Sequence, residues 1–131
     1  MMVLPDTSVW IEFFKGHEPY RSQLLELQEN EALKVIEVVF AELLQGALHQ
    51  REVTLIETYY GLLPQVEVPH LILKAGKYAQ SQRLVQHGMS LIDAIIIKAC
   101  LEENLLLWTL DKKVLRFLNN NSVPYFGKLN D

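Results

Sequence analysis

Short apolar runs alternate along the chain with longer segments in which apolar residues recur at helical spacing. Continuous short runs are typical of buried strands, and a period of about 3.6 residues is typical of helices packed on a core. The pattern predicts strands at residues 2–5, within 32–39, and at 66–68, 105–109 and 123–126. It predicts helices at residues 8–15, 20–29, 40–50, 52–62, 71–87, 91–103 and 112–119. This alternation indicates an α/β fold, a three-layer α/β/α sandwich around a mostly parallel sheet of about four to five strands.

The chain length of 131 residues fits one domain, residues 1–131, with a core of its own. Half of the residues are apolar and 21% are charged, which excludes disordered and collagen-like classes. No apolar run reaches roughly 18 residues, the length that a membrane span needs. The first residues lack the features of a signal peptide, so we expect a cytoplasmic protein. The single cysteine, Cys100, excludes a disulfide framework and is expected to be a buried thiol.

The charge balance constrains the class of ligand. Sixteen acidic and twelve basic residues leave a net charge of −4. This argues against a sequence-independent nucleic-acid binder, which normally carries a basic excess. It leaves open an enzyme that holds phosphates with a local basic patch and a metal ion.

The carboxylates that follow the predicted strands suggest a common site. The chain has four aspartates, and only Asp131, its last residue, lies away from such a position. Asp6 and Asp111 each follow a predicted buried strand, while Asp93 and Glu42 are expected in the first turns of helices. Because the carboxyl ends of parallel strands share one sheet edge, these four side chains should converge there. Converging carboxylates repel one another unless a cation lies between them, and hard oxygen ligands suit Mg²⁺ or Mn²⁺.

Each of these residues also has a purely structural explanation. Asp6 and Asp111 are typical helix N-caps, and Ser90 with Asp93 has the spacing of a capping box. Glu42 near a helix N-terminus would interact favourably with the helix dipole. Capping alone, however, does not require aspartate to be almost confined to these places.

Four short motifs, in order, resemble those of PIN-domain ribonucleases. They are residues 6–11 (DTSVWI), residues 41–46 (AELLQG), Gly88 with residues 91–96 (LIDAII), and residues 109–111 (TLD). The motifs extend over nearly the whole chain, and it is their ordered set that is specific. Within this superfamily, the chain length and the motif wording resemble the toxin component of VapBC-type toxin–antitoxin systems.

The resemblance implies a metal-dependent hydrolysis of RNA phosphodiester bonds. It implies that Asp6, Glu42, Asp93 and Asp111 are the catalytic, metal-binding residues, with Mg²⁺ or Mn²⁺ as the cofactor. It further implies an RNA substrate, a small cognate antitoxin protein that covers the site, and a homodimer. Candidates to contact the carboxylates or the RNA are the neighbouring hydroxyl and basic side chains Thr7, Ser8, Thr109, Lys112, Lys113 and Arg116.

Two departures from the family pattern affect the expected geometry. Pro5 stands where the family usually has a residue with a backbone N–H, which removes a donor at the end of the first strand. Glu37 stands where a Ser or Thr often precedes the second motif, and we expect it to be a solvated carboxylate. Two other functions stay open: a housekeeping PIN nuclease in RNA processing, and a non-catalytic α/β interaction domain whose aspartates are caps.

Overall fold

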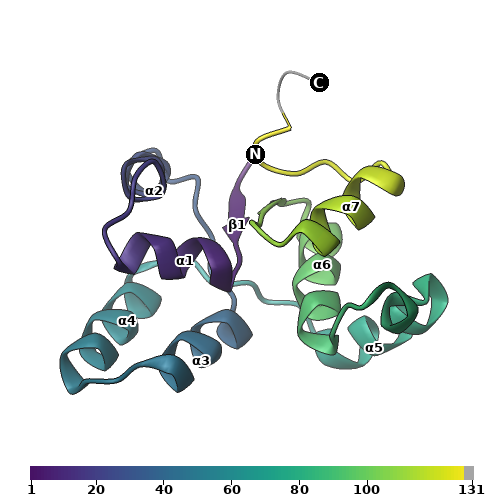
Figure 1. Cartoon of the computed structure of the whole chain (residues 1–131), viewed down its shortest axis with the longest axis horizontal. Coiled ribbons are helices and arrows are strands. Elements are labelled where there is room, and N and C mark those ends of the chain that lie inside the picture. The colour runs from purple at the N-terminus through teal and green to yellow at the C-terminus, as the bar shows by residue number, and fades with distance from the viewer. Residues whose placement is uncertain (129–131) are drawn as a thin grey trace.

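A computed structural model describes residues 1–128, so Asp131 lies outside the described residues. Two strands, β1 (Val3–Pro5) and β2 (Leu106–Trp108), pair in parallel at the centre of the molecule (Figure 1). None of the helices in the described part of the chain is long and apolar enough to cross a membrane. The helices are α1 (Thr7–Phe14), α2 (Tyr20–Glu29), α3 (Glu37–Gly46), α4 (Gln50–Leu62), α5 (Leu71–Gln82), the 3₁₀ helix η1 (Leu84–His87), α6 (Leu91–Glu103) and α7 (Lys112–Asn120).

Single parallel bridges extend the β1–β2 pair on both sides. β1 bridges Leu33, Val35 in turn bridges Gln65, and β2 bridges Tyr125 on its far side. Across the sheet the order is therefore Gln65, residues 33–35, β1, β2 and Tyr125, and every pairing is parallel. Residues 33–35 and then Gln65 are added on the β1 side of the central pair, and Tyr125 is added on the β2 side. In such sheets ligands bind beyond the carboxyl ends of the strands where the order reverses, which here is the crevice between β1 and β2.

The sheet has fewer regular strands than the sequence predicts. Within residues 1–128, the predicted strands at 32–39 and 123–126 are reduced to isolated bridges, and the strand predicted at 66–68 is replaced by one bridge at Gln65. Pro5 gives a physical reason on one side of β1. There, Val3 N donates to Ala32 O at 2.8 Å and Lys34 N donates to Val3 O at 2.9 Å. Two residues later the same side of β1 presents Pro5, which has no N–H, so the ladder ends.

Pro5 does not disturb the position of Asp6. Alternate residues of a strand direct their N–H groups to opposite neighbours, so Asp6 N faces β2. It donates to Trp108 O at 2.9 Å, which continues the β1–β2 pairing up to the first residue of the predicted site. The missing N–H of Pro5 therefore does not interrupt the β1–β2 pairing at Asp6.

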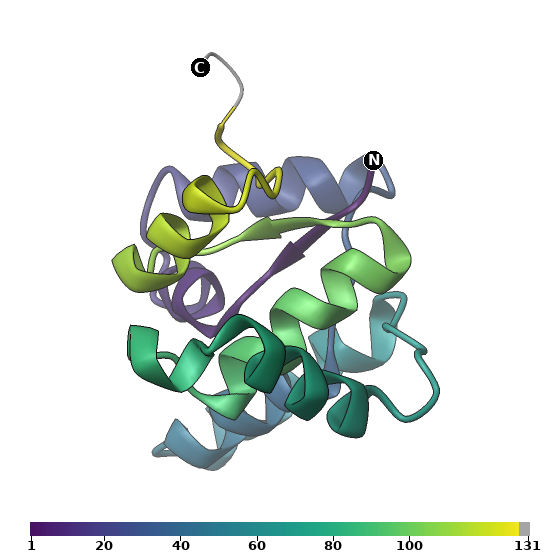
Figure 2. The same ribbon diagram turned by 90° about the vertical axis from the view of Figure 1, so that its right-hand side faces the viewer.

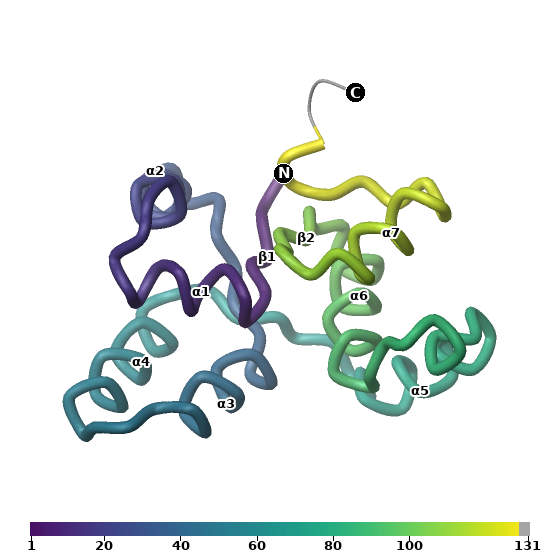
Figure 3. Tube along the Cα trace, viewed as in Figure 1, coloured from purple at the N-terminus to yellow at the C-terminus, as the bar shows by residue number. Residues whose placement is uncertain are grey.

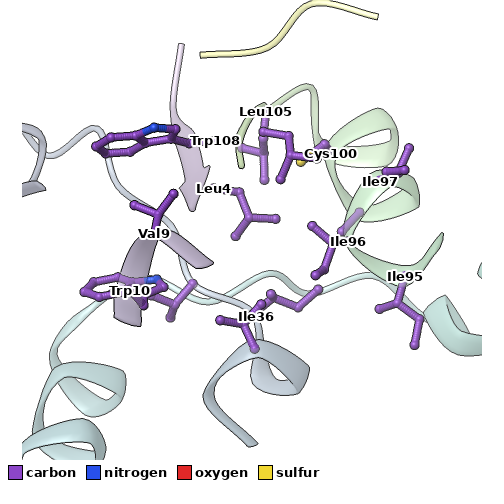
Figure 4. Close-up of a cluster of buried hydrophobic side chains, with 14 of the residues drawn as sticks. Leu4, Val9, Trp10, Ile36, Ile95, Ile96, Ile97, Cys100, Leu105 and Trp108 are labelled. Carbon is purple, nitrogen blue, oxygen red and sulfur yellow. The ribbon is translucent and has the colours of Figure 1, made fainter. Parts of the chain in front are cut away.

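Helices cover both faces of the sheet, as the sandwich prediction requires. In Figure 1, α1 to α4 lie to one side of β1, and α5, α6 and α7 lie to the other. The quarter turn in Figure 2 displays the strands between these layers, with α6 crossing alongside them. α6 is buried on several faces, because both the sheet and α5 pack against it. Ile96 and Cys100 of α6 point toward Leu4 of β1 in the core (Figure 4). The buried residues of α6 are Ala94, Ile95, Ile96, Ile97, Ala99 and Cys100.

An aromatic cluster fixes α1, the helix that follows β1. Trp10 is 1% exposed, and its ring lies 5.3 Å from that of Phe13 and 5.2 Å from that of Phe40, centroid to centroid. Tyr59 of α4 packs edge-on against Phe13 at 5.2 Å. Such pairs add specific geometry to the burial of large apolar surfaces. The cluster therefore holds the first turn of α1 in a fixed orientation relative to the sheet.

Two predicted helices differ from the structure by more than two residues at an end, and the others agree to within two residues. The helix predicted at 40–50 runs from Glu37 to Gly46, because Ile36 takes the extended N-cap conformation and Glu37 supplies negative charge to the first turn. The helix predicted at 71–87 ends at Gln82, where Arg83 adopts a left-handed conformation with φ of 55° before η1 begins. Just before this break, the Ser81 hydroxyl donates to Tyr78 O at 3.0 Å and competes for a helical carbonyl.

Candidate active site

Asp6 lies at the carboxyl end of β1 and caps α1. Its Oδ1 accepts hydrogen bonds from Ser8 Oγ at 2.5 Å and from Val9 N at 3.4 Å. Asp6 itself has extended backbone angles, as an N-cap residue should. Its side chain is half-buried beneath the first turn of α1.

The surroundings of Asp6 disfavour its charge. Burial raises the pKa of the Asp6 carboxyl, and hydrogen bonds from the Ser8 and Thr109 side chains and from the backbone offset part of that rise. Within residues 1–128, none of the carboxylates of Asp6, Glu42, Asp93 and Asp111 forms an ion pair. A partly desolvated carboxylate with hydroxyl partners and no cationic partner is the electrostatic setting that a bound cation would relieve.

Glu42 is linked to the same helix end by Thr7. Thr7, the first residue of α1, donates from Oγ1 to Glu42 Oε1 at 2.5 Å. The prediction that Glu42 lies in a first helical turn is wrong, because α3 begins at Glu37 and Glu42 lies in its interior. A residue in that position gains little from the helix dipole, which acts mainly within the first turn. The structural explanation of Glu42 as a helix-end charge is therefore lost.

Asp111 lies three residues after the end of β2, whereas Asp6 follows β1 directly. It caps α7 by accepting a hydrogen bond from Lys113 N at 2.8 Å, and its own N–H donates to Thr109 Oγ1 at 3.1 Å. Leu110 N donates to Ser8 Oγ at 3.0 Å, which joins the end of β2 directly to the first turn of α1. The tube trace in Figure 3 shows β1 and β2 at the centre, with the chain turning from them into α1 and α7.

Asp93 is held at the start of α6 by a capping box. Ser90 N donates to Asp93 Oδ2 at 2.9 Å, and Asp93 N donates to Ser90 Oγ at 3.2 Å. The loop before α6 also contacts α7, because Lys113 Nζ donates to Gly88 O at 3.1 Å. The segments that carry Asp93 and Asp111 are therefore joined five residues before Asp93 and two residues after Asp111.

Hydrogen bonds link the surroundings of three of the four predicted carboxylates, whereas the Asp93 carboxylate bonds to Ser90 of its own capping box. Hydrogen bonds through Thr7, Ser8 and Thr109 connect the surroundings of Asp6, Glu42 and Asp111. Asp6, Asp93 and Asp111 all make the capping contacts that the structural explanation requires. In the part of the chain that is described, no three His, Cys, Asp or Glu side chains are gathered closely enough to hold a metal ion. By donor chemistry, the four carboxylates suit a hard cation such as Mg²⁺ or Mn²⁺.

The predicted substrate-contacting residues fall into two groups. Thr7, Ser8 and Thr109 lie in the hydrogen-bond network just described, and Thr109 is buried. Lys112, Lys113 and Arg116 are exposed on α7, and Lys113 and Arg116 line a polar cavity beside it. The other residues of that cavity were not predicted from the sequence. The amide-rich end of α7 was the available signal, and it resembles an ordinary solvated helix face.

The fold and this arrangement agree with the sequence comparisons. Residues 3–118 match the PIN domain family, and the chain belongs to that family. The match begins at β1 and ends within α7, so it contains all four carboxylates.

Individual relatives extend this finding. The chain is 30% identical over 116 residues to Ribonuclease VapC32 of Mycobacterium tuberculosis, strains CDC 1551 / Oshkosh and H37Rv, covering 86% of this chain and 87% of the relative. Among solved structures, PAE2754 from Pyrobaculum aerophilum is similar with a TM-score of 0.58 and 17% identity. That match covers 88% of this chain and 85% of the other, and it supports the fold.

Proposed function

We propose that the protein is a metal-dependent ribonuclease that hydrolyses RNA phosphodiester bonds, and that it is the toxin of a toxin–antitoxin pair. One observation carries the proposal: carboxylates end two adjacent parallel strands in a chain that is 30% identical to a ribonuclease over 116 residues. The strand ends form the crevice where ligands of such sheets bind.

In this proposal Asp6, Glu42, Asp93 and Asp111 are catalytic and hold Mg²⁺ or Mn²⁺. The half-buried Asp6 carboxylate, which has no cationic partner among the described residues, is the central ligand. When bound, the ion lowers the pKa of a bound water and stabilises negative charge on the phosphate. Thr7 orients Glu42 and Ser8 orients Asp6, because their hydroxyls already donate to those carboxylates.

The positive charge for the RNA backbone comes from α7. Lys112, Lys113 and Arg116 follow Asp111 within two turns of the helix. Phosphates that approach the acidic edge would contact these cations. The positive charges would locally offset the repulsion between the phosphates and the carboxylates, although the chain is acidic overall. Thr109 is a further candidate to orient the carboxylates from the end of β2.

The proposed protein partners have apolar surfaces available to them. A groove between α1, α3 and α4 opens beside Glu42, and exposed Ile11, Leu48 and Leu55 line it. An antitoxin segment seated there would cover the site. A second copy of the chain would use the larger apolar cavity between α3 and α5, where Ile72 and Leu73 are 65% and 77% exposed. The protein acts in the cytoplasm, where its RNA substrate is found.

The test is cleavage of a mixed RNA pool by the purified protein with Mg²⁺ or Mn²⁺, with EDTA, and with the variant Asp6→Asn. We expect cleavage that needs the metal and is lost in the variant. Calorimetry on the same samples should find metal binding that is weakened by the substitution. Absence of both cleavage and metal binding in the parent protein would overturn the proposal and favour an interaction domain with capping aspartates.

The toxin assignment has its own test. Expression of the protein without a partner should arrest growth, and Asp93→Asn should remove the arrest while the protein remains folded. Persistent arrest by a folded Asp93→Asn protein would mean that toxicity does not depend on the acidic site. Cleavage in vitro without any growth arrest would instead favour a housekeeping nuclease.

A further inference from the structure

A polar cavity lies beside the acidic edge, between η1 and α7. Its volume is about 440 Å³, and its walls come from the end of η1 and from one side of α7. Figure 2 shows these two segments, η1 in green and α7 in yellow-green, at the same edge of the molecule. The hydrogen bond from Lys113 Nζ to Gly88 O joins the two walls. The cavity is therefore a built feature of the fold, although its two walls are about 25 residues apart in the chain.

The lining combines groups that recognise phosphate with groups that recognise base edges. Lys113 and Arg116 supply positive charge, and Gln86 and Asn120 supply side-chain amides. As far as the described residues go, the lining includes no Asp or Glu, although the chain carries sixteen. Basic side chains bind phosphates, while amide side chains can both donate to and accept from a nucleobase.

The lining also includes one apolar side chain and one amide of fixed orientation. Phe117 is 6% exposed and lines the cavity from the core side. Asn121 Nδ2 donates to Phe117 O at 2.9 Å, which fixes the orientation of the Asn121 side chain. Oriented polar groups beside an apolar wall suit an unstacked base of a single-stranded RNA. An apolar peptide would instead leave the amides and cations without partners.

The position of the cavity relates it to the bond that would be cut. Asp111 caps α7, and Arg116 follows five residues later on the same helix. At a rise of about 1.5 Å per residue, Arg116 lies roughly 7–8 Å further along the axis. On the opposite wall, the chain runs from His87 through Gly88 and Ser90 to Asp93. Both walls therefore continue along the chain to proposed catalytic carboxylates, since Lys113 lies two residues from Asp111 and His87 lies six residues from Asp93.

We propose that this cavity is a nucleotide subsite, which holds the base and phosphate of a nucleotide flanking the scissile bond. The inference rests on the proposed ribonuclease function and adds a site of base selection to it. Gln86, Asn120 and Asn121 contact the base, and Lys113 and Arg116 contact its phosphate. The subsite acts on RNA binding and on the choice of cleavage position rather than on the chemical step.

The first experiment measures binding and does not need cleavage. The full-length protein in EDTA is titrated against a fluorescent, short single-stranded RNA of random sequence over a range of salt concentrations. Arg116→Ala should weaken binding about fivefold or more and lower the salt slope by about 0.7, the value for one phosphate contact on a single strand. Asn120→Ala should weaken binding at an unchanged slope. Arg51→Ala and Asn30→Ala, two exposed residues of α4 and of the end of α2, are matched controls.

The second experiment measures base preference during cleavage. Sequencing of product ends should reveal a preference at one position next to the cut in the parent protein. Gln86→Ala and Asn120→Ala should flatten that preference and raise KM at an unchanged kcat. Circular dichroism confirms that each variant is folded, and Asn120→Ser replaces any Asn120→Ala protein that is not.

The outcomes separate this inference from the proposed function. If the cavity variants bind and select RNA as the controls do, the subsite is wrong, whether or not the protein is a nuclease. If the parent protein binds RNA through the cavity but cuts none with Mg²⁺ or Mn²⁺, the ribonuclease proposal fails while the subsite stands as an RNA-binding site. A fall in kcat alone in the cavity variants would move these residues into the catalytic machinery and would also overturn the subsite.

Discussion

Replacing Asp6 with asparagine separates the structural role of this side chain from its proposed catalytic role. Asparagine is as good an N-cap as aspartate, and its Oδ1 can accept the same hydrogen bonds from Ser8 Oγ and Val9 N. The substitution removes only the negative charge. Because burial raises the pKa of the Asp6 carboxyl, that charge destabilises the folded protein at neutral pH in the absence of metal. We therefore expect Asp6→Asn to unfold at a higher temperature than the parent at pH 7.

Asp6→Ala provides the scale for the measurement. Alanine lacks the capping side chain, which costs about 1 kcal/mol of folding stability. It also leaves the Ser8 hydroxyl without its acceptor, which costs about another 1 kcal/mol. Unfolding entropies of about 2.1 cal/mol/K per residue give roughly 0.28 kcal/mol/K for 131 residues, so 1 kcal/mol shifts Tm by about 3.6 °C. The Asn variant should therefore melt about 7 °C above the Ala variant.

The dependence on pH identifies the cause of the gain. A carboxyl whose pKa is raised in the folded state binds more protons there than in the unfolded state. Its contribution to stability is therefore greatest below the unfolded pKa, near 3.8, and is lost as the pH rises through the folded value. The advantage of Asp6→Asn should be full at pH 7 and should disappear as the pH falls below about 4.

The assay is thermal unfolding of the three proteins between pH 7 and pH 3.5, with EDTA and with Mg²⁺. Mg²⁺ should raise Tm of the parent protein and leave that of Asp6→Asn nearly unchanged, because only the parent retains the charged ligand. RNA cleavage by Asp6→Asn should be lost at every pH. An Asn variant that is less stable than the parent at pH 7, or whose gain is the same at every pH, would refute this reasoning.

Three further predictions concern single contacts. Thr7→Val removes the hydroxyl that donates to Glu42, and it should lower kcat/KM for RNA cleavage about tenfold while Tm falls by less than about 7 °C. Unchanged cleavage would mean that the contact does not orient Glu42. Gly88→Ala should lower Tm by about 4–7 °C in thermal unfolding, because φ is 76° at this position. Gly61→Ala inside α4 should be neutral or stabilising, and equal effects of the two substitutions would contradict the strain argument. Leu24→Ala should cost about 2–5 kcal/mol in denaturant unfolding, because this side chain is 1% exposed, while its neighbour Leu25, 38% exposed, should tolerate alanine at a much smaller cost.

The sequence was sufficient to predict elements whose local signals agree with their burial. The helix at Tyr20–Glu29 and the helix at Leu91–Glu103 have the predicted bounds. The first follows Pro19 and ends before Asn30, and the second lies between the Ser90 capping box and the left-handed Asn104. β1 and β2 were predicted because both are short, fully apolar runs followed by a capping aspartate. Residues 33–35 illustrate the opposite case. Their alternation of buried Leu33 and Val35 with Lys34 is typical of a strand, yet Pro5 on the neighbouring chain segment removes the donor that would extend the pairing.

The carboxylates could be predicted and the cavity could not, for one physical reason. Each carboxylate follows a strand or begins a helix, so its place at the sheet edge follows from chain order and the handedness of crossovers. The cavity instead depends on the break at Arg83, which turns η1 toward α7, and that residue adopts its left-handed conformation without a glycine or proline to signal it. The bound at Glu37 was missed similarly, since the valines after it favour strand in isolation and helix in this packing.

The pairing of β1 with β2 has a consequence for the synthesis of the protein. Val3 pairs with Leu106, so the strand made first waits for a partner encoded about 100 residues later. At translation rates of about 5–20 residues per second, this interval lasts roughly 5–20 s. During that time the emerging chain contains Asp6 and Glu42 but has neither β2 nor Asp111, and the acidic edge cannot assemble. A ribosome that makes this protein is therefore not exposed to the activity of its own nascent chain until almost the whole sequence has emerged.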